Sequence, residues 1–230
     1  DFVKDEAELL SFIDFLPELE KDEFLLVKII QRHKYIETNV NNYTKDRQVA
    51  AHIVNKNSDF LKVILKSEYD YYEHPESICI QAFINPRSWL KAAKKVSLRI
   101  TEKIFANLPH ESYDVQRLLM QEASRGNVSN NSIKSRSWVR SYDIDEKNES
   151  NVVTLESILP DNSYMLIETN NGYHLHVRPQ LVTLLGGDSL WDRNIRKYII
   201  GLDQSNSNDL MTAIPGVIRG NFVPKILHKP

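Results

Sequence analysis

Two short apolar runs flank an Asn-Gly pair in the stretch "YMLIETNNGYHLHV", residues 164–177. Runs rich in Tyr, Ile, Leu and Val on either side of such a pair are the strongest local signal for an antiparallel hairpin. Side chains alternate between the faces of a strand, so His174 and His176 share one face and the apolar residues of "YHLHV" share the other. The chain is therefore expected to build a sheet here, with two imidazoles on one side.

The length of the turn decides which residues accompany the histidines. A two-residue loop that ends at Gly172 mixes polar and apolar side chains on each face. A three-residue loop that starts at Asn170 and gives Gly172 a positive φ separates them. We therefore predict the three-residue loop, which places Glu168 opposite His174. The face that carries Glu168, His174 and His176 should then point away from the core.

Other apolar runs end in acidic residues. The run "WVRSYDID" predicts a strand with Asp143 and Asp145 on one face, about 7 Å apart between Cα atoms. Two carboxylates that close repel each other unless a proton or a cation lies between them, and oxygen ligands suit Mg²⁺ or Mn²⁺. The run "RKYIIGLD" predicts another strand ending in a third acid, Asp203, with Asp209 as the alternative. A solvated strand end is the other interpretation of the Asp-x-Asp pair.

The order of these features resembles the three motifs of the archaeo-eukaryotic primase superfamily, the primase-polymerases. The motifs are a strand ending in "DID", a hairpin with "NGYH", and "LD" followed by "NDLMTAIPG", all within residues 138–225. The resemblance implies that the catalytic metal ligands are Asp143, Asp145 and Asp203. It implies that His174 contacts the phosphates of the incoming nucleotide, and the predicted nucleotide-binding set is completed by His176, Gly172 and Arg219. Two departures are Gly172, where the family commonly has Ser, and the absence of a zinc-binding stem.

The resemblance also implies an α/β (α+β) fold with a two-lobed core, in which helices pack on a mixed or antiparallel sheet that carries the motifs. The expected lobes are a helix and strand unit at 1–121 and the motif-bearing sheet at 138–230. Between them, residues 122–137 are rich in Ser, Asn and Arg and predict a mobile loop. The implied activity is that of a DNA primase or polymerase, which extends a nucleic-acid strand by two-metal nucleotidyl transfer with Mg²⁺ or Mn²⁺. The implied partners are a nucleic-acid template, nucleoside triphosphates and a helicase.

A strand, a tight turn and a helix are predicted from "ICIQAFI" and the run "NPRSWLKAAKKVSLRITEKIFANL", with Ser88 as the helix N-cap. One face of this helix repeats a basic residue every four positions: Lys91, Lys95, Arg99 and Lys103. The opposite, packed face is expected to consist of Leu90, Ala93, Val96, Ile100 and Ile104. The basic face is either a solvated surface or a nucleic-acid surface, with Arg87 in the turn as a further phosphate donor. Arg125, Lys134 and Arg136 of the predicted loop could extend it.

Composition limits the classes of site and partner that this chain can have. The 29 basic and 31 acidic residues nearly balance, so a polyanion would have to be attracted by a local basic surface. The single Cys79 excludes an internal disulfide and a Cys-rich metal site, and it suits a reducing cytosol. No apolar run approaches the roughly 20 residues that span a bilayer, and the acidic N-terminus is unlike a signal peptide. We therefore expect a cytoplasmic protein without a membrane partner. The resemblance implies a plasmid or viral member, since many of these also lack a zinc-binding stem.

Two other functions fit the same residues. A metal-dependent nuclease also uses aspartates on strands to hold divalent ions. A catalytically silent relative of a phage or plasmid would keep the fold to bind nucleic acid or protein.

Overall fold

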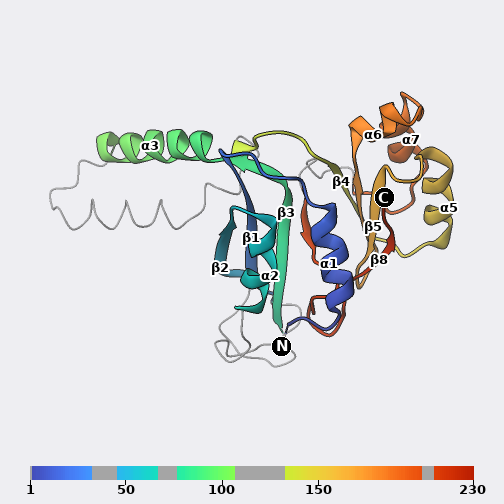
Figure 1. Cartoon of the computed structure of the whole chain (residues 1–230), viewed down its shortest axis with the longest axis horizontal. Helices are drawn as coiled ribbons and strands as arrows, with labels where there is room; N and C mark the ends of the chain where they lie inside the picture. The colour runs from blue at the N-terminus through green and yellow to red at the C-terminus, as the bar shows by residue number, and fades with distance from the viewer. Residues whose placement is uncertain (1, 33–45, 67–76, 107–132, 204–209) are drawn as a thin grey trace.

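The computed structural model describes residues 2–32, 46–66, 77–106, 133–203 and 210–230, and of residues 47, 99, 100 and 102–106 it describes the backbone alone. Within these ranges the chain forms two four-stranded antiparallel sheets and six helices (Figure 1). The predicted α/β class, with helices packed on an antiparallel sheet, is confirmed at this level. None of the helices in the described ranges is both long and apolar enough to cross a bilayer.

The first sheet has the strand order β2-β1-β3-β7. Its strands are β1 (Glu23–Gln31), β2 (Arg47–Val54), β3 (Ile78–Ser88) and β7 (Met211–Ala213). Two helices, α1 (Glu6–Phe15) and α2 (Asn57–Leu65), contribute buried residues to the core on one of its faces. Helix α1 ends before Pro17: Asp5 caps it by accepting the Glu8 N–H, and Leu16 is extended, as a residue before proline prefers.

The second sheet has the strand order β4-β6-β5-β8. Its strands are β4 (Arg140–Ile144), β5 (Tyr164–Glu168), β6 (Tyr173–Val177) and β8 (Lys225–His228). Its outer face packs against α5 (Glu149–Ile158), α6 (Pro179–Leu184) and α7 (Trp191–Tyr198) through one apolar cluster. The strands predicted from "WVRSYDID", "YMLIE" and "YHLHV" are therefore confirmed.

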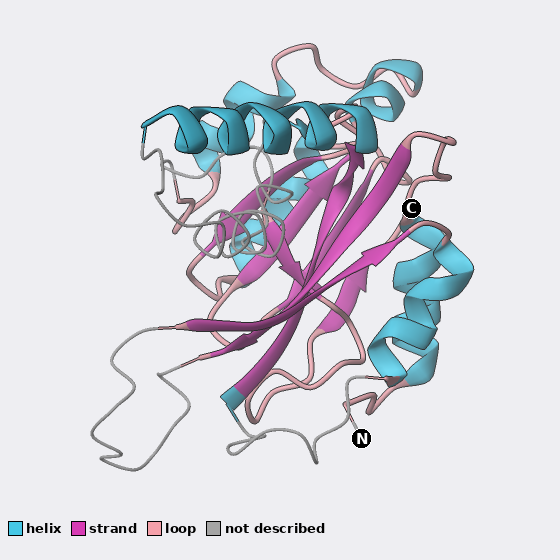
Figure 2. Cartoon of the chain, turned by 90° about the vertical axis from the view of Figure 1, so that its left-hand side faces the viewer, coloured by secondary structure: helices cyan, strands magenta, loops and turns pink. Residues whose placement is uncertain are grey.

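The inner face of the second sheet packs on the first sheet, and Figure 2 shows the strands of both sheets together in the middle of the molecule. Met165 and Ile167 of β5 share a core with Val27 of β1 and Ile80 of β3. Both faces of β5 and β6 are consequently buried. The predicted division of the hairpin into a core face and an open face is wrong.

The predicted hairpin register is also wrong. The connection has four residues, Thr169 to Gly172, and pairs Glu168 with Tyr173. Gly172 does not have a positive φ. Its requirement for glycine comes from close packing, because a Cβ there would lie 1.8 Å from the Ile144 carbonyl oxygen. Glu168 therefore lies on the opposite face from the histidines, where it forms a 2.6 Å ion pair with Lys147.

Residues 196–203 are not the apolar strand predicted from "RKYIIGLD". They complete α7, whose buried Trp191 and Ile195 lie one turn apart, and then turn at Gly201, which has φ +74°. Leu202 forms an isolated bridge to Ile144, so the segment still reaches the end of β4. The segment 138–230 also does not form one sheet, because β7 pairs with β3 of the first sheet.

The junction of β3 and α3 (Trp89–Ala106) differs from the predicted tight turn, since β3 runs without a break to Ser88. Ser88 is confirmed as the N-cap, because its hydroxyl accepts the Lys91 N–H at 3.1 Å. The predicted packed face is wrong where side chains are described: Leu90 is exposed, and Ala92 is the buried position on the first turns. Figure 1 shows α3 leaving the end of β3 and projecting away from the sheet.

Candidate active site

The three predicted acids lie on neighbouring segments of backbone. Asp143 lies in β4, and Asp145 is the first residue after the end of β4. The Asp203 N–H donates to the Asp143 carbonyl at 3.0 Å, and the Asp145 N–H donates to the Gly201 carbonyl at 2.9 Å. The bridge at Leu202 thus acts as a short strand beside β4 and brings Asp203 next to the Asp143 and Asp145 pair. Asp209 lies outside the described residues.

The electrostatics of Asp143 reflect this clustering. Burial raises the pKa of Asp143 from its ordinary 3.8 to about 6. The negative charges of Asp145 and Asp203 act in the same direction, because an ionised Asp143 would be repelled by both. The positive charges of Arg219 and Arg32 oppose the rise. Asp143 is therefore close enough to all four groups to feel their charges.

Two arginines from the first sheet complete the charge distribution. Arg219 forms an isolated bridge to Cys79 of β3, and Arg32 follows β1, where it forms a 3.1 Å ion pair with Asp46. The Nε atoms of both arginines are buried without a hydrogen-bond partner in the described structure. Sequence reasoning included Arg219 but missed Arg32. No local signal marks Arg32, since the fold of β1 onto β3 alone brings it to the site.

His174 lies beside Asp143 on the paired strand β6. Its side chain is only 5% exposed, and its Nε2 lies 3.6 Å from Asp143 Oδ1. The backbone N–H of Ala213 donates to His174 Nδ1 at 3.1 Å. Burial lowers the pKa of His174 well below its ordinary value, and the charges of Arg219 and Arg32 act in the same direction. The ring is therefore neutral, and with Nδ1 accepting, its proton is on Nε2.

His176 lies two residue pairs further along β6, opposite Ser141, and is completely buried. Its Nδ1 lies 2.9 Å from the Ser141 hydroxyl and its Nε2 lies 2.7 Å from the Thr212 hydroxyl. Burial lowers its pKa to about 3, so it is neutral. His176 therefore has no access to solvent. The predicted partner of His174, Glu168, is replaced by Thr212 and Ala213 of β7.

The residues predicted to bind nucleic acid do not form one surface in the described part of the chain. Arg87 belongs to β3 and is 0% exposed, so its predicted role as a surface donor in a turn is wrong. Lys91 is exposed and its ammonium donates to the Lys134 carbonyl at 2.8 Å, whereas Lys95 is partly buried. The side chains of Arg99 and Lys103 lie outside the described residues. The basic face of α3 is thus described only in its first turns.

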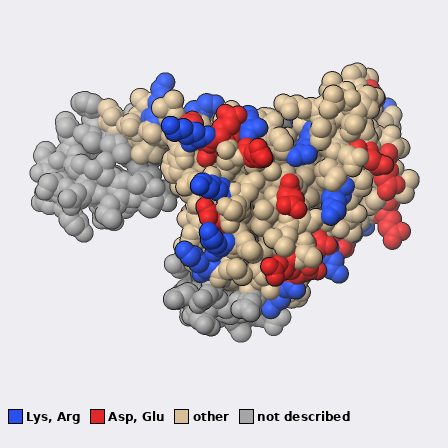
Figure 3. All heavy atoms as spheres, in the orientation of Figure 1, with Lys and Arg blue, Asp and Glu red and all other residues tan. Residues whose placement is uncertain are grey.

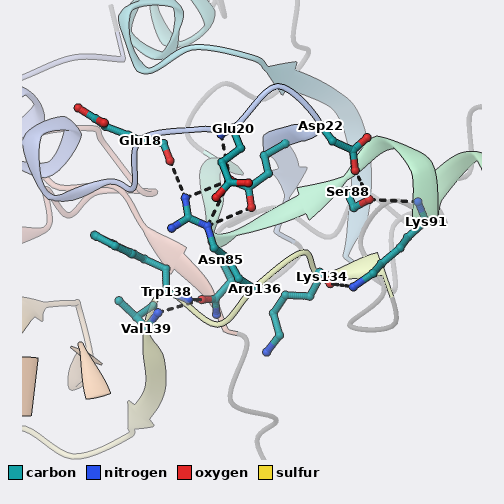
Figure 4. Close-up of polar contacts among 11 residues, drawn as sticks. Glu18, Glu20, Asp22, Asn85, Ser88, Lys91, Lys134, Arg136, Trp138 and Val139 are labelled. Atoms are coloured by element: carbon teal, nitrogen blue, oxygen red, sulfur yellow. Dashed lines mark hydrogen bonds and ion pairs between the residues drawn. The ribbon is translucent and has the colours of Figure 1, made fainter. Parts of the chain in front are cut away.

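The segment after residue 132 anchors the chain instead of offering a free basic surface (Figure 4). Arg136 forms a 3.0 Å ion pair with the buried Glu23 and donates to the Glu18 carbonyl at 2.6 Å. The Asn85 side chain accepts the N–H groups of residues 138 and 139. Residues 122–132 of the predicted mobile loop, with Arg125, lie outside the described residues. Figure 3 shows basic and acidic side chains interspersed on one face of the molecule, in keeping with the balanced composition.

A divalent cation fits the chemistry of the acidic cluster. No three His, Cys, Asp or Glu side chains in the described part of the chain are arranged to hold a metal ion as they stand. The donor set of Asp143, Asp145 and Asp203 nevertheless consists of carboxylates, which are the ligands that Mg²⁺ and Mn²⁺ prefer. Burial and the charges of Asp145 and Asp203 raise the pKa of Asp143 more than Arg219 and Arg32 lower it, and a bound cation would favour its ionised form.

Comparison with known proteins gives no independent guide to function. No family model, curated protein or solved structure matches this chain.

Proposed function

We propose that the chain is a metal-dependent nucleotidyltransferase of the primase-polymerase type, which adds nucleotides to a nucleic-acid strand. The observation that supports this proposal is the meeting of Asp143, Asp145 and Asp203 with the Nε2–H of His174 and the charge of Arg219. Carboxylates alone would repel a triphosphate, and arginines alone would repel a metal ion. A site that combines both suits a complex of a divalent cation with a nucleotide.

The phosphate side of the site would be formed by His174, Arg219 and Arg32. A neutral imidazole with its proton on Nε2 can donate one hydrogen bond to a phosphate oxygen without adding charge. A guanidinium can donate two parallel hydrogen bonds to phosphate, and its charge offsets part of the nucleotide's charge. The buried Nε atoms of Arg219 and Arg32 leave donor capacity for such a ligand.

The metal side would be formed by Asp143, Asp145 and Asp203, which would hold Mg²⁺ or Mn²⁺. When bound, these ions would polarise the phosphates and help to activate the attacking hydroxyl of the strand. Asp143 would bind the cation in its ionised form, so binding should weaken as the pH falls towards about 6.

We also propose that the two packed sheets are the two lobes of a primase-polymerase core, with the site between β4 and the arginines of the first sheet. The motif resemblance adds five further parts to this proposal: a two-metal mechanism, a nucleic-acid template, a helicase partner, a cytoplasmic site of action and a phage or plasmid origin.

A nuclease is the second candidate because the same carboxylates suit it. The arginines and His174 beside them favour a nucleoside triphosphate instead.

The direct test of this proposal is the combination of thermal unfolding with a strand-extension assay. Mn²⁺ should raise the unfolding midpoint, and a nucleoside triphosphate should raise it further, because a ligand that binds only the folded state stabilises it. Labelled nucleotide should then enter a template strand, with or without a primer. Asp161→Asn, at an exposed turn, is the control and should behave as wild type in both assays.

Three results would contradict the proposal. Shortening of the labelled strand without extension would identify a nuclease. Binding of nucleic acid without any product would identify the silent relative. The absence of any Mn²⁺ response would remove the metal site altogether.

The basic face of α3 gives a separate prediction about the template. If Lys91 and Lys95 contact phosphates, replacing both with Ala should reduce the slope of log affinity against log salt concentration by about 1.8, since each contact contributes about 0.9 on duplex DNA. Lys197→Ala, in an exposed position on α7, should leave the slope unchanged. A double variant with the wild-type slope would show that this face is only solvated.

A further inference from the structure

The ring of His174 is held by groups from the opposite sheet. Thr212 Oγ1 lies 3.0 Å from His174 Nδ1 and 2.7 Å from His176 Nε2, and the Ser141 hydroxyl lies 2.9 Å from His176 Nδ1. All four residues are buried, with exposures of the whole residue between 0% and 4%. They form a polar relay in the order Ser141, His176, Thr212, His174. Since Thr212 belongs to β7 and the other three to β4 and β6, the relay joins the two sheets.

The backbone determines the direction in which His174 faces. An amide N–H can only donate, so the bond from Ala213 requires His174 Nδ1 to be an acceptor. The single proton of the neutral ring is then on Nε2, the atom that lies 3.6 Å from Asp143. A rotated ring would instead turn a carbon atom towards the Ala213 N–H and leave that buried donor unpaired, which is costly.

The Thr212 hydroxyl has one proton and three possible acceptors: His174 Nδ1 at 3.0 Å, His176 Nε2 at 2.7 Å and the Ala213 carbonyl at 3.3 Å. Because His174 Nδ1 is an acceptor, donation by Thr212 to that atom, which is closer than the Ala213 carbonyl, avoids two lone pairs facing each other at 3.0 Å. Thr212 must then accept from the Nε2–H of His176, and His176 Nδ1 must accept from Ser141. In this arrangement every N–H and O–H of the relay has an acceptor, with the Nε2–H of His174 left for the site.

We propose that Thr212 and His176 are positioning residues, which hold the His174 ring with its Nε2–H towards Asp143 and the nucleotide phosphates. This inference rests on the proposed nucleotide-binding role of His174. It adds that the Nε2–H of His174 is oriented by Thr212 of the first sheet. The same contact therefore joins the two sheets and fixes the His174 ring for nucleotide binding.

The test compares Thr212→Val, which removes the hydroxyl with little change of shape, with Thr212→Ser, which keeps it. In ligand-free protein, ¹⁵N NMR of the imidazoles should show a single Nε2–H form of His174 in wild type and Thr212→Ser. Thr212→Val should shift or broaden these resonances. The KM for the nucleotide should rise about tenfold in Thr212→Val, the usual effect of losing one hydrogen bond, and recover in Thr212→Ser. Thr183→Val, at an exposed position on α6, is the control and should match wild type.

Wild-type resonances and wild-type KM in Thr212→Val would overturn the proposal. If Thr212→Val does not fold, Ser141→Ala decides the matter, because it removes only the far hydroxyl of the relay. It should change the ¹⁵N signals of His176 and of His174, and a change confined to His176 would overturn the proposal. The NMR measurement needs no nucleotide, so a wild-type protein with the expected His174 signals but no nucleotide affinity would contradict the proposed function and leave the positioning role standing.

Discussion

Asp143→Asn should abolish strand extension and, in the absence of metal, make the protein more stable at pH 8. The extension rate should fall by about a thousandfold or more, the order of effect that follows the loss of one electrostatic group from a transition state. The unfolding midpoint should rise by about 2–4 °C, the shift expected from roughly 1 kcal/mol in a domain of this size. Opposite effects on stability and activity are characteristic of a charge that is kept for binding a ligand.

The sign of the stability effect follows from the raised pKa of Asp143. Its pKa is about 6 in the folded protein and its ordinary value is 3.8, so the folded state binds the proton more tightly than the unfolded state. Between these values stability falls as the pH rises, and above about 6 the full cost of the ionised carboxylate is present. Its side chain is 28% exposed, and solvent screening keeps the expected gain small. Asparagine removes the charge, so its advantage should be complete at pH 8 and should disappear as the pH falls towards 4.

The control for this prediction is Asp161→Asn, whose unfolding midpoint should match wild type at both pH values. With Mn²⁺ present the order should reverse, because wild type gains the stability of the bound ion and Asp143→Asn does not. An Asp143→Asn protein that is less stable than wild type at pH 8 without metal would show that the acidic cluster is not repulsive. That result would remove the main electrostatic argument for a cation at the site.

The strands that carry the motifs could be predicted from sequence because their signals are local. Five-residue runs such as "YHLHV" and "RSYDI" have β propensity, and both become strands. Their register could not be derived in the same way. The argument from alternation assumes one buried face, but Met165 and Ile167 pack against the other sheet while Leu166 and Leu175 pack against the helices. With both faces buried, polarity no longer distinguishes one register from the next.

The sequence predicts the third acid, Asp203, at the end of an apolar strand, and this structural reason is incorrect. Asp203 reaches β4 through a single bridge that follows a helix and a glycine turn, and not as the end of a strand. The spacing of Trp191 and Ile195, one helical turn apart, was the signal for that helix. Arg32 and Thr212 could not be placed at the site from sequence, because their positions depend on long-range pairing of β1 and β7 with β3. Such pairings are not encoded in any short stretch of sequence, which is why the cationic side of the site and the partners of His174 were missed.

Arg219→Ala should weaken nucleotide binding by about 10–100-fold, the range expected for losing hydrogen bonds to a charged group. Arg219 is close enough to affect both Asp143 and His174, and its Nε has no partner in the described structure. The probe should be inorganic triphosphate as well as a nucleoside triphosphate, because a contact to phosphate alone must cost both ligands the same factor. Arg219→Lys should recover part of the affinity, since an ammonium keeps the charge but cannot make two parallel hydrogen bonds.

Arg193→Ala, at an exposed position on α7, is the matched control and should bind as tightly as wild type. Combining Arg219→Ala with His174→Ala should give a loss smaller than the sum of the two separate free-energy losses, because groups that share one ligand are coupled. Full additivity would indicate that the two side chains bind different parts of the ligand. Unchanged affinity for both ligands in Arg219→Ala would place the phosphates elsewhere, because the guanidinium whose charge acts on Asp143 would then have no role in binding them.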